Sequence, residues 1–443
     1  MSISPKVKTP STKYTTPFVL LFSCGLFFSF PAVAEPWVNY LGSHYREMPW
    51  AGSVRDPEGA GFFSGIYSAE KTTTLKDYIS TKDIIYSPGG LGSGRSSAAV
   101  DHFMTHILLD FGKTWKDQLQ KNVDIIAAMP ATSGDVYWQF GNEINSRRFS
   151  ETIHQWEDTG QRINAHDPTL IPYYVEYFLA PGVDAIRSAK TQGKGKNIYI
   201  VLGSLAAAAN PKAQKFLDEL LNYKVQGLTS PSLQGLKVYE LIDVISLHYI
   251  ASANVSSWRG SLDSIHQKWF QKGKINAIWS TEEVGLQRAK QNQGGVSSLQ
   301  VFARYMDWWQ QHKMTATQGR TFFWGADQGA SNTKTNDAMG FLYQQLGASS
   351  ELVALPVSQQ PKLSGENIEY YSFEILPSKK RLLIVFPADQ KRSGKVTSAA
   401  LGSFGKPEFH RLFSDTGISQ QEQTYETGFT LSPGSLQFVI AQP

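Results

Sequence analysis

Between Asn197 and Asp327 the sequence alternates between short apolar runs and longer segments whose apolar residues recur at helical spacing. The connections between these segments are short, and this order limits the folds that the chain can adopt. Strands joined by crossover helices run parallel, so the order predicts an α/β fold with a parallel sheet. The predicted strands are 197–203, 241–249, 275–283 and 321–327, and the predicted helices are 210–221, 257–272 and 296–312.

The part of the chain before this region is less regular. Asp83–Ser87 and Asp135–Phe140 are predicted as buried strands, and Pro172–Lys190 is predicted as a long amphipathic helix. Trp37–Leu41 is either a first strand of the same sheet or a strand lent to the C-terminal domain. His102–His106 has the i, i+4 histidine spacing of a zinc-binding helix but lacks the usual glutamate, so histidines packed on one face are favoured.

Polar or aromatic residues lie at or just after the ends of several predicted strands, namely Glu143, His248 with Tyr249, Glu282 and Trp324. A barrel of eight parallel strands brings such ends to one rim, where barrel enzymes place their chemistry. An open doubly wound sheet is the alternative, but the sequence has no well-placed dinucleotide fingerprint. We therefore expect a (β/α)8 TIM barrel over residues 35–348, with neither a cofactor nor a metal.

The composition changes after about Ala348. Residues 349–366 are rich in Ser, Pro and Gln and are predicted to cross between two domains. Beyond them apolar and polar residues alternate at strand period, and Pro377–Lys380 is predicted as a hairpin turn. The predicted strands are 368–375, 381–386, 408–413, 429–431 and 435–440. Residues 349–443 are therefore expected to form an antiparallel β-sandwich domain.

Residues 1–34 have the composition of a cleaved signal peptide. Three lysines precede an apolar run at 18–30 that is short for a membrane span, and Ala32-Val33-Ala34 matches a cleavage site. Cys24 leaves a lipoprotein signal as an alternative. Removal of the three lysines lowers the net charge from +4 to +1, which argues against a nucleic-acid partner. We expect a periplasmic or secreted protein whose mature chain has no membrane span.

Glu143 and Glu282 suggest a specific chemistry. A lone Asn-Glu pair after a strand is more often an ordinary turn, but a second strand-end carboxylate changes that interpretation. Cleavage of a glycosidic bond needs one carboxylic acid to protonate the leaving oxygen and one carboxylate to meet the sugar cation. Asn142 can bind the hydroxyl beside the reacting carbon, and Trp138 and Trp324 are candidate substrate contacts. Burial by Trp138 or Trp324 would also raise the pKa of the acid.

The chain resembles clan A glycoside hydrolases in three segments, which look like their fourth, sixth and seventh strands: Tyr137-Trp-Gln-Phe-Gly-Asn-Glu-Ile-Asn145, Ile245-Ser-Leu-His-Tyr249 and Ile278-Trp-Ser-Thr-Glu282. Its C-terminal part is similar to the sandwich of family 39 and its relatives. The resemblance implies a retaining hydrolase of polysaccharides or oligosaccharides. The roles that it implies are acid/base for Glu143, nucleophile for Glu282, ligand of the neighbouring hydroxyl for Asn142, support of the nucleophile for His248 and Tyr249, and aromatic platform under the sugar for Trp324.

The chain differs from these hydrolases at the seventh strand. Their usual ending is Thr-Glu-x-Gly, whereas the ending here is one residue longer, Thr281-Glu-Glu-Val-Gly285. Counting from Thr281 selects Glu282 as the nucleophile, whereas counting back from Gly285 selects Glu283. Successive residues on a strand face opposite sides, so only one of the two can face the substrate. Glu282 is preferred, because buried side chains fix strand register whereas loops absorb insertions.

Two other functions are compatible with the same sequence. A non-catalytic carbohydrate-binding or polysaccharide-assembly protein can be built on the same fold, and the longer seventh strand is where a nucleophile would be lost. A transglycosidase would use the same carboxylates with a sugar acceptor in place of water. Covalent labelling by a 2-fluoro-sugar separates an enzyme from a binding protein, and product analysis separates a transglycosidase from a hydrolase.

Overall fold

In the computed structural model of this protein, the described residues are 35–44, 85–88, 102–107, 135–141, 143–146, 165–193, 198–251, 255–283, 294–324, 341–342, 344–347, 349–389, 391–400, 404–414, 417–418 and 428–443. They belong to one compact unit, Ala34–Pro443. The predicted signal peptide and Asn142 lie outside the described residues.

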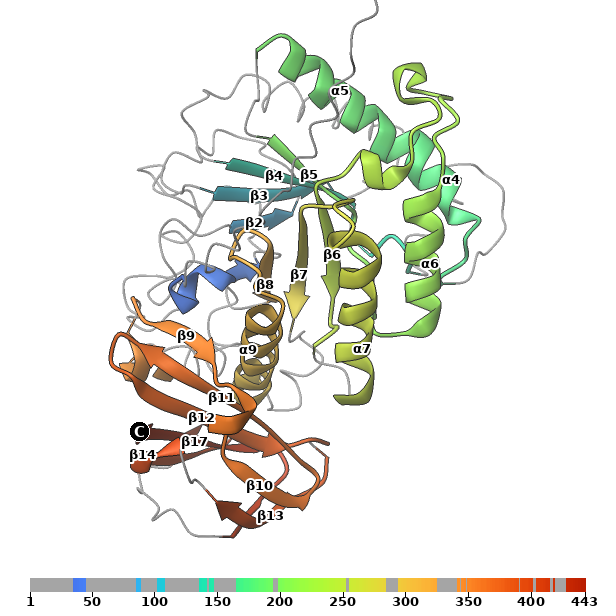
Figure 1. Ribbon diagram of the computed structural model, residues 1–443. Coiled ribbons are helices and arrows are strands. Elements are labelled where there is room, and N and C mark those ends of the chain that lie inside the picture. The colour runs from blue at the N-terminus through green and yellow to red at the C-terminus, as the bar shows by residue number, and fades with distance from the viewer. Residues whose placement is uncertain are drawn as a thin grey trace, which may run out of the picture. The chain divides into compact units, whose positions relative to one another are not determined.

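Eight parallel strands pair side by side and close into a barrel (Figure 1). The strands are β1 (Leu41–His44), β2 (Ile85–Pro88), β3 (His102–Ile107), β4 (Asp135–Phe140), β5 (Ile198–Val201), β6 (Val244–His248), β7 (Ala277–Glu283) and β8 (Gly319–Trp324). The ring closes between β1 and β8, whose pairs run from Leu41 with Thr321 to His44 with Trp324. The parallel sheet predicted from the strand–helix order is confirmed.

Side chains along the strands alternate between the inside of the barrel and the helices outside it. The interior cluster consists of Tyr137, Val201, Val244, Ala277, Trp279 and Phe322. The rings of Tyr137 and Trp279 lie 4.5 Å apart although β4 and β7 are not neighbours, so this contact crosses the barrel. Ile245 and Ile278, one position along, belong instead to the larger core shared with the helices.

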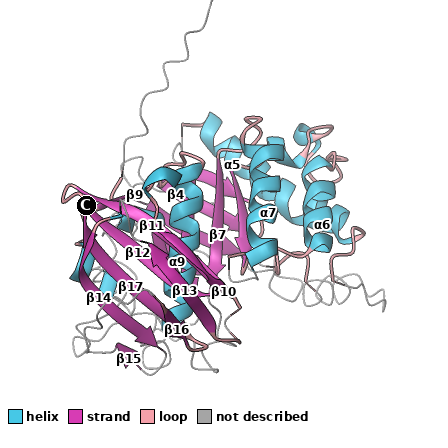
Figure 2. Cartoon of the chain, turned by 60° about the horizontal axis from the view of Figure 1, so that its bottom comes forward, coloured by secondary structure: helices cyan, strands magenta, loops and turns pink. Residues whose placement is uncertain are grey.

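Helices lie outside the parallel strands (Figures 1 and 2). They are α4 (Leu170–Tyr174), the π-helix η3 (Val175–Leu179) and α5 (Ala180–Thr191) in one continuous run, α6 (Pro211–Asn222), α7 (Val255–Ile265) with the π-helix η6 (His266–Phe270), and α9 (Gly294–Gln311). Short 3₁₀ turns are η1 (Trp37–Tyr40), η4 (Pro231–Leu233), η5 (Val238–Glu240) and η8 (Val357–Gln359). Among the described helices, none combines the length and the apolar composition that a membrane crossing requires.

The start of α6 shows how the sequence fixes a helix end. The side-chain oxygen of Asn210 accepts a hydrogen bond from the backbone N–H of Lys212 at 2.9 Å, and Pro211 occupies the first turn. Both features are favourable because the first backbone N–H groups of a helix have no partner within it. The helix predicted at 210–221 therefore begins where the sequence places it.

His102–His106 is a strand, β3, so the helical spacing considered for its two histidines is wrong. On a strand, residues i and i+4 are about 13 Å apart, which is too far for both to bind one metal ion. The segment pairs with β4 over its whole length and with β2 from Phe103 to His106, and this backbone pairing decides its structure in place of the local histidine spacing. The sequence also predicts a helix at 115–129, which lies outside the described residues.

Residues after 348 form two antiparallel sheets (Figure 2). The six-stranded sheet has the order β15-β14-β17-β12-β11-β9 and the three-stranded sheet the order β10-β13-β16. Leu383 and Val439 of the larger sheet share one apolar cluster with Val396 and Leu431 of the smaller sheet. The strands are β9 (Glu351–Ala354), β10 (Lys362–Glu366), β11 (Ile368–Leu376), β12 (Lys380–Pro387), β13 (Gly394–Ala400), β14 (Lys406–Ser414), β15 (Gly417–Ile418), β16 (Phe429–Leu431) and β17 (Ser435–Gln442).

The prediction that residues 349–366 merely cross between domains is wrong, because β9 and β10 lie within them. Four of the five residues of β10 are exposed, so it lacks the apolar alternation by which strands are found. β9 continues the larger sheet beside β11.

The segment before β1 contacts both parts of the fold. Its backbone forms a bridge between Pro36 and Glu351, and the N–H of Trp37 donates to the carbonyl of Ser350 at 2.9 Å. The strand that follows closes the barrel. Trp37–Tyr40 itself is the 3₁₀ turn η1, so the strand predicted at Trp37–Leu41 is wrong over these residues, and the barrel strand begins only at Leu41.

Candidate active site

Glu143 follows β4 in a backbone conformation that its neighbours hold in place. Its φ is 49° and that of Gly141 is 91°, both in the left-handed region. The backbone N–H of Glu143 donates to the hydroxyl of Ser204 at 3.2 Å, and that of Ile144 donates to the carbonyl of Ser204 at 3.0 Å. The turn after β4 is therefore fixed against the loop after β5.

The ends of β4 and β5 approach each other closely. A Cβ atom at Gly203 would lie 2.3 Å from the carbonyl oxygen of Phe140, so the approach requires glycine there. The hydroxyl of Tyr174 donates to the same carbonyl at 2.8 Å and accepts from the N–H of Gly203 at 2.9 Å. Burial raises the pKa of Tyr174, so the hydroxyl keeps the proton that it donates.

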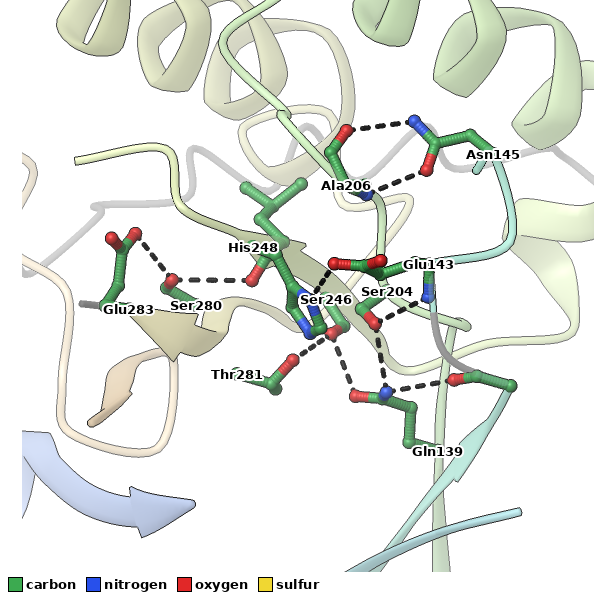
Figure 3. Close-up of polar contacts among 12 residues, drawn as sticks. Gln139, Glu143, Asn145, Ser204, Ala206, Ser246, His248, Ser280, Thr281 and Glu283 are labelled. Atoms are coloured by element: carbon green, nitrogen blue, oxygen red, sulfur yellow. Dashed lines mark hydrogen bonds and ion pairs between the residues drawn. The ribbon is translucent and has the colours of Figure 1, made fainter. Parts of the chain in front are cut away.

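Asn145 ties the Glu143 turn to the loop after β5. Its side-chain amide donates to the carbonyl of Ala206 at 3.0 Å and accepts from the N–H of Ala206 at 2.7 Å (Figure 3). The same amide nitrogen lies 2.9 Å from Nδ1 of His166. Burial, and then the charge of Lys212, lower the pKa of His166, which favours the neutral ring that accepts this hydrogen bond.

His248 ends β6 and faces Glu143 (Figure 3). Its Nδ1 lies 3.4 Å from Oε1 of Glu143, a long hydrogen-bond distance. The His248 side chain is fully buried, whereas that of Glu143 is 31% exposed. Tyr249, with φ 53°, places its ring edge-on to His248 at 5.6 Å. A buried imidazole thus supports a carboxylate that remains open to solvent.

A chain of polar side chains inside the barrel lies under these residues. The hydroxyl of Ser246 donates to Oε1 of Gln139 at 2.9 Å and lies 2.5 Å from the hydroxyl of Thr281. Nε2 of Gln139 donates to the carbonyl of Gly141 at 3.0 Å and to the hydroxyl of Ser204 at 3.3 Å. Side chains from β4, β6 and β7 are therefore connected to the turn that carries Glu143 (Figure 3).

The end of β7 contains a β-bulge. On one side Leu247 pairs with Ser280 and His248 pairs with Glu282, so Thr281 is an extra residue. On the other side the register with β8 shifts between Ser280 and Glu283. The longer strand ending seen in the sequence is therefore accommodated inside the strand. The expectation that a loop absorbs the insertion is wrong.

Glu283 lies on the helix side of β7. Its side chain is fully buried, and its Oε1 accepts hydrogen bonds from the hydroxyls of Ser280 at 2.8 Å and Tyr305 at 3.0 Å. Figure 3 shows Glu283 beside Ser280 and away from Glu143. For Glu282, the structure gives the backbone register opposite His248.

The remaining predicted residues are placed by register alone. Trp324 ends β8 opposite His44 of β1. Trp138 lies on β4 between Tyr137 and Gln139, two residues that contact the barrel interior, so its register position belongs to the other face of the sheet. The sequence had given no role to Ser204, Gln139 or Asn145, although Asn145 stands two residues after Glu143 in the matched segment.

A cavity of about 460 Å³ opens at the opposite end of the barrel. It is lined at the N-terminal ends of the strands by Tyr137, Tyr199, Asp243, Val244, Phe270, Ile275, Asn276, Ala277, Thr317 and Gln318. Oδ2 of Asp243 accepts from the N–H of Ile200 at 2.8 Å and Oδ1 accepts from the amide of Asn276 at 3.2 Å. This carboxylate stabilises the barrel base, so the rim with Glu143 is the candidate site.

Metal-binding side chains do not cluster in the part of the chain that the structure describes. Within it, no three His, Cys, Asp or Glu residues group closely enough to hold an ion.

No protein-family model matches the sequence, and no curated protein matches it. Several solved structures are similar to it at low identity. A conserved exported protein from Bacteroides fragilis has 9% identity and a TM-score of 0.42, with 82% of this chain and 88% of that chain covered. A family 51 α-L-arabinofuranosidase from Bifidobacterium longum has 11% identity and a TM-score of 0.45, with 93% and 97% covered.

A third similar structure is a GH128 curdlan-specific exo-β-1,3-glucanase from Blastomyces gilchristii in complex with glucose, with 14% identity, a TM-score of 0.37, and 69% and 98% covered. Two of the three are thus glycoside hydrolases, and neither of these belongs to family 39. With TM-scores below 0.5, these similarities do not assign a family or an activity to this chain.

Proposed function

We propose that this protein is a retaining glycoside hydrolase of a polysaccharide or oligosaccharide, with Glu143 as acid/base and Glu282 as nucleophile. The proposal includes the (β/α)8 barrel over residues 35–348 and the β-sandwich over 349–443. It also includes export by the predicted signal peptide to the periplasm or the medium. The mechanism uses only carboxylates of the chain and requires no cofactor.

One observation carries the proposal: His248 is the common neighbour of both glutamates. Its Nδ1 lies 3.4 Å from the carboxylate of Glu143, and its backbone pairs with that of Glu282. Paired residues on neighbouring strands are about 4.8 Å apart and face the same side of a sheet. This register supports two carboxylates at the short separation that a retaining mechanism needs, about 5 Å.

In the first step, a carboxylate oxygen of Glu282 attacks the anomeric carbon while protonated Glu143 gives its proton to the glycosidic oxygen. The bond between that carbon and that oxygen breaks, and the leaving sugar departs as an alcohol. In the second step, water attacks the same carbon and gives a proton to Glu143. The ester to Glu282 breaks, and both side chains return to their starting states.

The surrounding residues support these two roles. We assign His248 and Tyr249 to orient the nucleophile, Asn142 to bind the hydroxyl next to the reacting carbon, and Trp324 to contact the sugar face, as the sequence resemblance implies. The register of Trp138 argues against a substrate contact for that residue, so it is left out of the proposal.

The test uses Glu143→Gln and Glu282→Gln, assayed on a panel of 2,4-dinitrophenyl glycosides and on plant and bacterial polysaccharides. Each variant should keep its fold, measured by circular dichroism, and lose several orders of magnitude in kcat. Glu282→Gln removes the nucleophile, and Glu143→Gln removes both the acid that polysaccharide cleavage needs and the base that activates water in the second step. Glu219→Gln is the matched control, since Glu219 lies on α6 with 38% of its side chain exposed.

Three outcomes would contradict the proposal. Near-normal rates in both variants would exclude these residues as the catalytic pair. A wild-type protein that binds a glycan but takes no covalent label from a 2-fluoro-glycoside would be a binding protein. Products that carry an added sugar acceptor in place of water would make the protein a transglycosidase.

A further inference from the structure

Glu283, the residue after the proposed nucleophile, has a buried carboxylate that the proposed reaction does not use. Its side chain is 0% exposed. Oε1 accepts hydrogen bonds from the hydroxyl of Ser280 at 2.8 Å, the hydroxyl of Tyr305 at 3.0 Å and the backbone N–H of Ala251 at 3.1 Å. The three donors come from β7 itself, from α9 and from the turn after β6.

These contacts form a site built for a carboxylate. Removing a carboxylate from water is costly unless hydrogen-bond donors replace the water, and hydrogen bonds to a charged acceptor are the stronger kind. Burial, and then the charge of Glu283, raise the pKa of Tyr305 well above its usual value. The phenol therefore keeps its proton in neutral solution and remains a donor to Glu283.

The site also fixes an irregular piece of backbone. Ser280 and Glu283 are three residues apart, and a regular strand would turn them to opposite faces. Here their side chains bond to each other on the helix side of β7, because the bulge adds one residue between them. Thr281 holds the other face of the bulge through its contact with Ser246 inside the barrel, at 2.5 Å.

The bulge decides which glutamate pairs with His248. In the observed register His248 is opposite Glu282. If the strand were regular after Thr281, whose side chain is inside the barrel, position 282 would fall on the helix side and position 283 on the barrel side. The hydrogen bonds that hold Glu283 on the helix side of β7 therefore also fix the register of Glu282.

We infer that Glu283 is a positioning residue, whose buried carboxylate holds the β7 bulge in the register that sets Glu282 opposite His248. The inference rests on the proposed function, since it takes Glu282 as the nucleophile. Glu283 itself touches neither substrate nor reacting atoms. Its effect on the reaction passes through the backbone of the strand.

The principal test is Glu283→Gln, which keeps the shape of the side chain and removes its charge. With a 2,4-dinitrophenyl glycoside that the wild type cleaves, kcat per folded enzyme should fall about 10²-fold, the size of effect that a small misplacement of a reacting group produces. KM should change little, because the sugar-binding side chains are intact. A matching 2-fluoro-glycoside should still label Glu282, more slowly by a similar factor.

A milder variant, Tyr305→Phe, removes one donor and leaves the charge of Glu283. It should lower kcat in the same direction by a smaller factor. Tyr239→Phe is the matched control, because Tyr239 lies on η5 and packs by its ring against Trp269. If Glu283→Gln does not fold, Tyr305→Phe against this control decides the question.

The outcomes separate this inference from the proposed function. Wild-type kcat in both Glu283→Gln and Tyr305→Phe, with Glu282→Gln inactive, overturns the positioning role and leaves the hydrolase standing. Label found on Glu283 makes Glu283 the nucleophile and overturns the inference. Full activity of Glu143→Gln and Glu282→Gln removes the proposed function, and the inference with it.

Discussion

At the scale of single residues, the rim of the barrel holds several backbones in an uncommon conformation. Glu143 after β4, Ala207 after β5 and Tyr249 after β6 have φ of 49°, 49° and 53°. Residues with side chains adopt this region rarely, and they concentrate at functional sites where other contacts hold them. At Glu143 the holding contact is the hydroxyl of Ser204. The orientation of Glu143, the proposed acid, therefore depends on Ser204 after the neighbouring strand β5.

We predict that Ser204→Ala loses about 1–2 kcal/mol of unfolding free energy, because buried groups of Glu143 and Gln139 lose a partner. We expect kcat to fall roughly tenfold as the turn loosens. Urea denaturation and steady-state kinetics measure the two effects. Ser188→Ala on the exposed side of α5 should change neither. Unchanged stability and kcat in Ser204→Ala would show that the turn holds its shape without this contact.

At the scale of elements, the helices and strands predicted most accurately are those in which one spacing of apolar residues extends over the whole segment. The strands β4 to β8 and the helices α6, α7 and α9 lie close to their predicted positions, since each carries a regular apolar pattern. β10 and β13 were missed because they are exposed or lack that pattern. The bulge in β7 could not be placed either, because an added residue fits a loop or a strand equally well until the partners on both sides are known.

The contact between η6 and α9 makes stability depend on pH. His266 is 4% exposed and its ring lies 4.2 Å from that of His312 and 5.6 Å from that of Trp308. Burial, and then the charge of His312, lower the pKa of His266 to about 4, while Asp263 opposes the shift. Between pH 4 and 6.5 the unfolded chain binds a proton that the folded chain excludes.

We therefore predict that the unfolding free energy falls as the pH drops from 6.5 through 4, by at most about 3 kcal/mol from this group. His266→Phe keeps the ring contacts and removes the titration, so its stability should depend less on pH in that window. Guanidinium denaturation at a series of pH values measures the slope. Equal slopes in the two proteins would mean that other groups cause the acid sensitivity.

At the scale of the whole molecule, α9 connects the barrel to the six-stranded sheet. Arg304 is 1% exposed and donates to Glu369 of β11 through Nε at 2.9 Å and Nη2 at 2.7 Å. The hydroxyl of Tyr371 donates to the same carboxylate at 2.6 Å. Removing one partner of a buried ion pair strongly lowers the unfolding free energy, because the other charge stays buried without a counter-charge. The two parts of the chain should therefore unfold together.

We predict that Arg304→Met lowers the unfolding free energy by about 3–5 kcal/mol, because Glu369 is left buried without its counter-charge. The double variant Arg304→Met with Glu369→Leu should recover much of that loss. Urea denaturation followed by tryptophan fluorescence and by far-ultraviolet circular dichroism should give coincident transitions for the wild type. Two separate transitions, or a cost below about 1 kcal/mol for Arg304→Met, would contradict the coupling.

The seam between β1 and β8 joins two parts of the chain that are made far apart in time. Trp37 donates through its indole N–H to the carbonyl of Gly347 at 2.8 Å, across 310 positions. A polypeptide that emerges from the ribosome with its N-terminus leading presents β1 long before any of these partners exist. Such distant pairings form slowly, and β1 can pair early only with β2, on its other side. The barrel therefore cannot close before β8 has left the ribosome, when most of the chain has already been made.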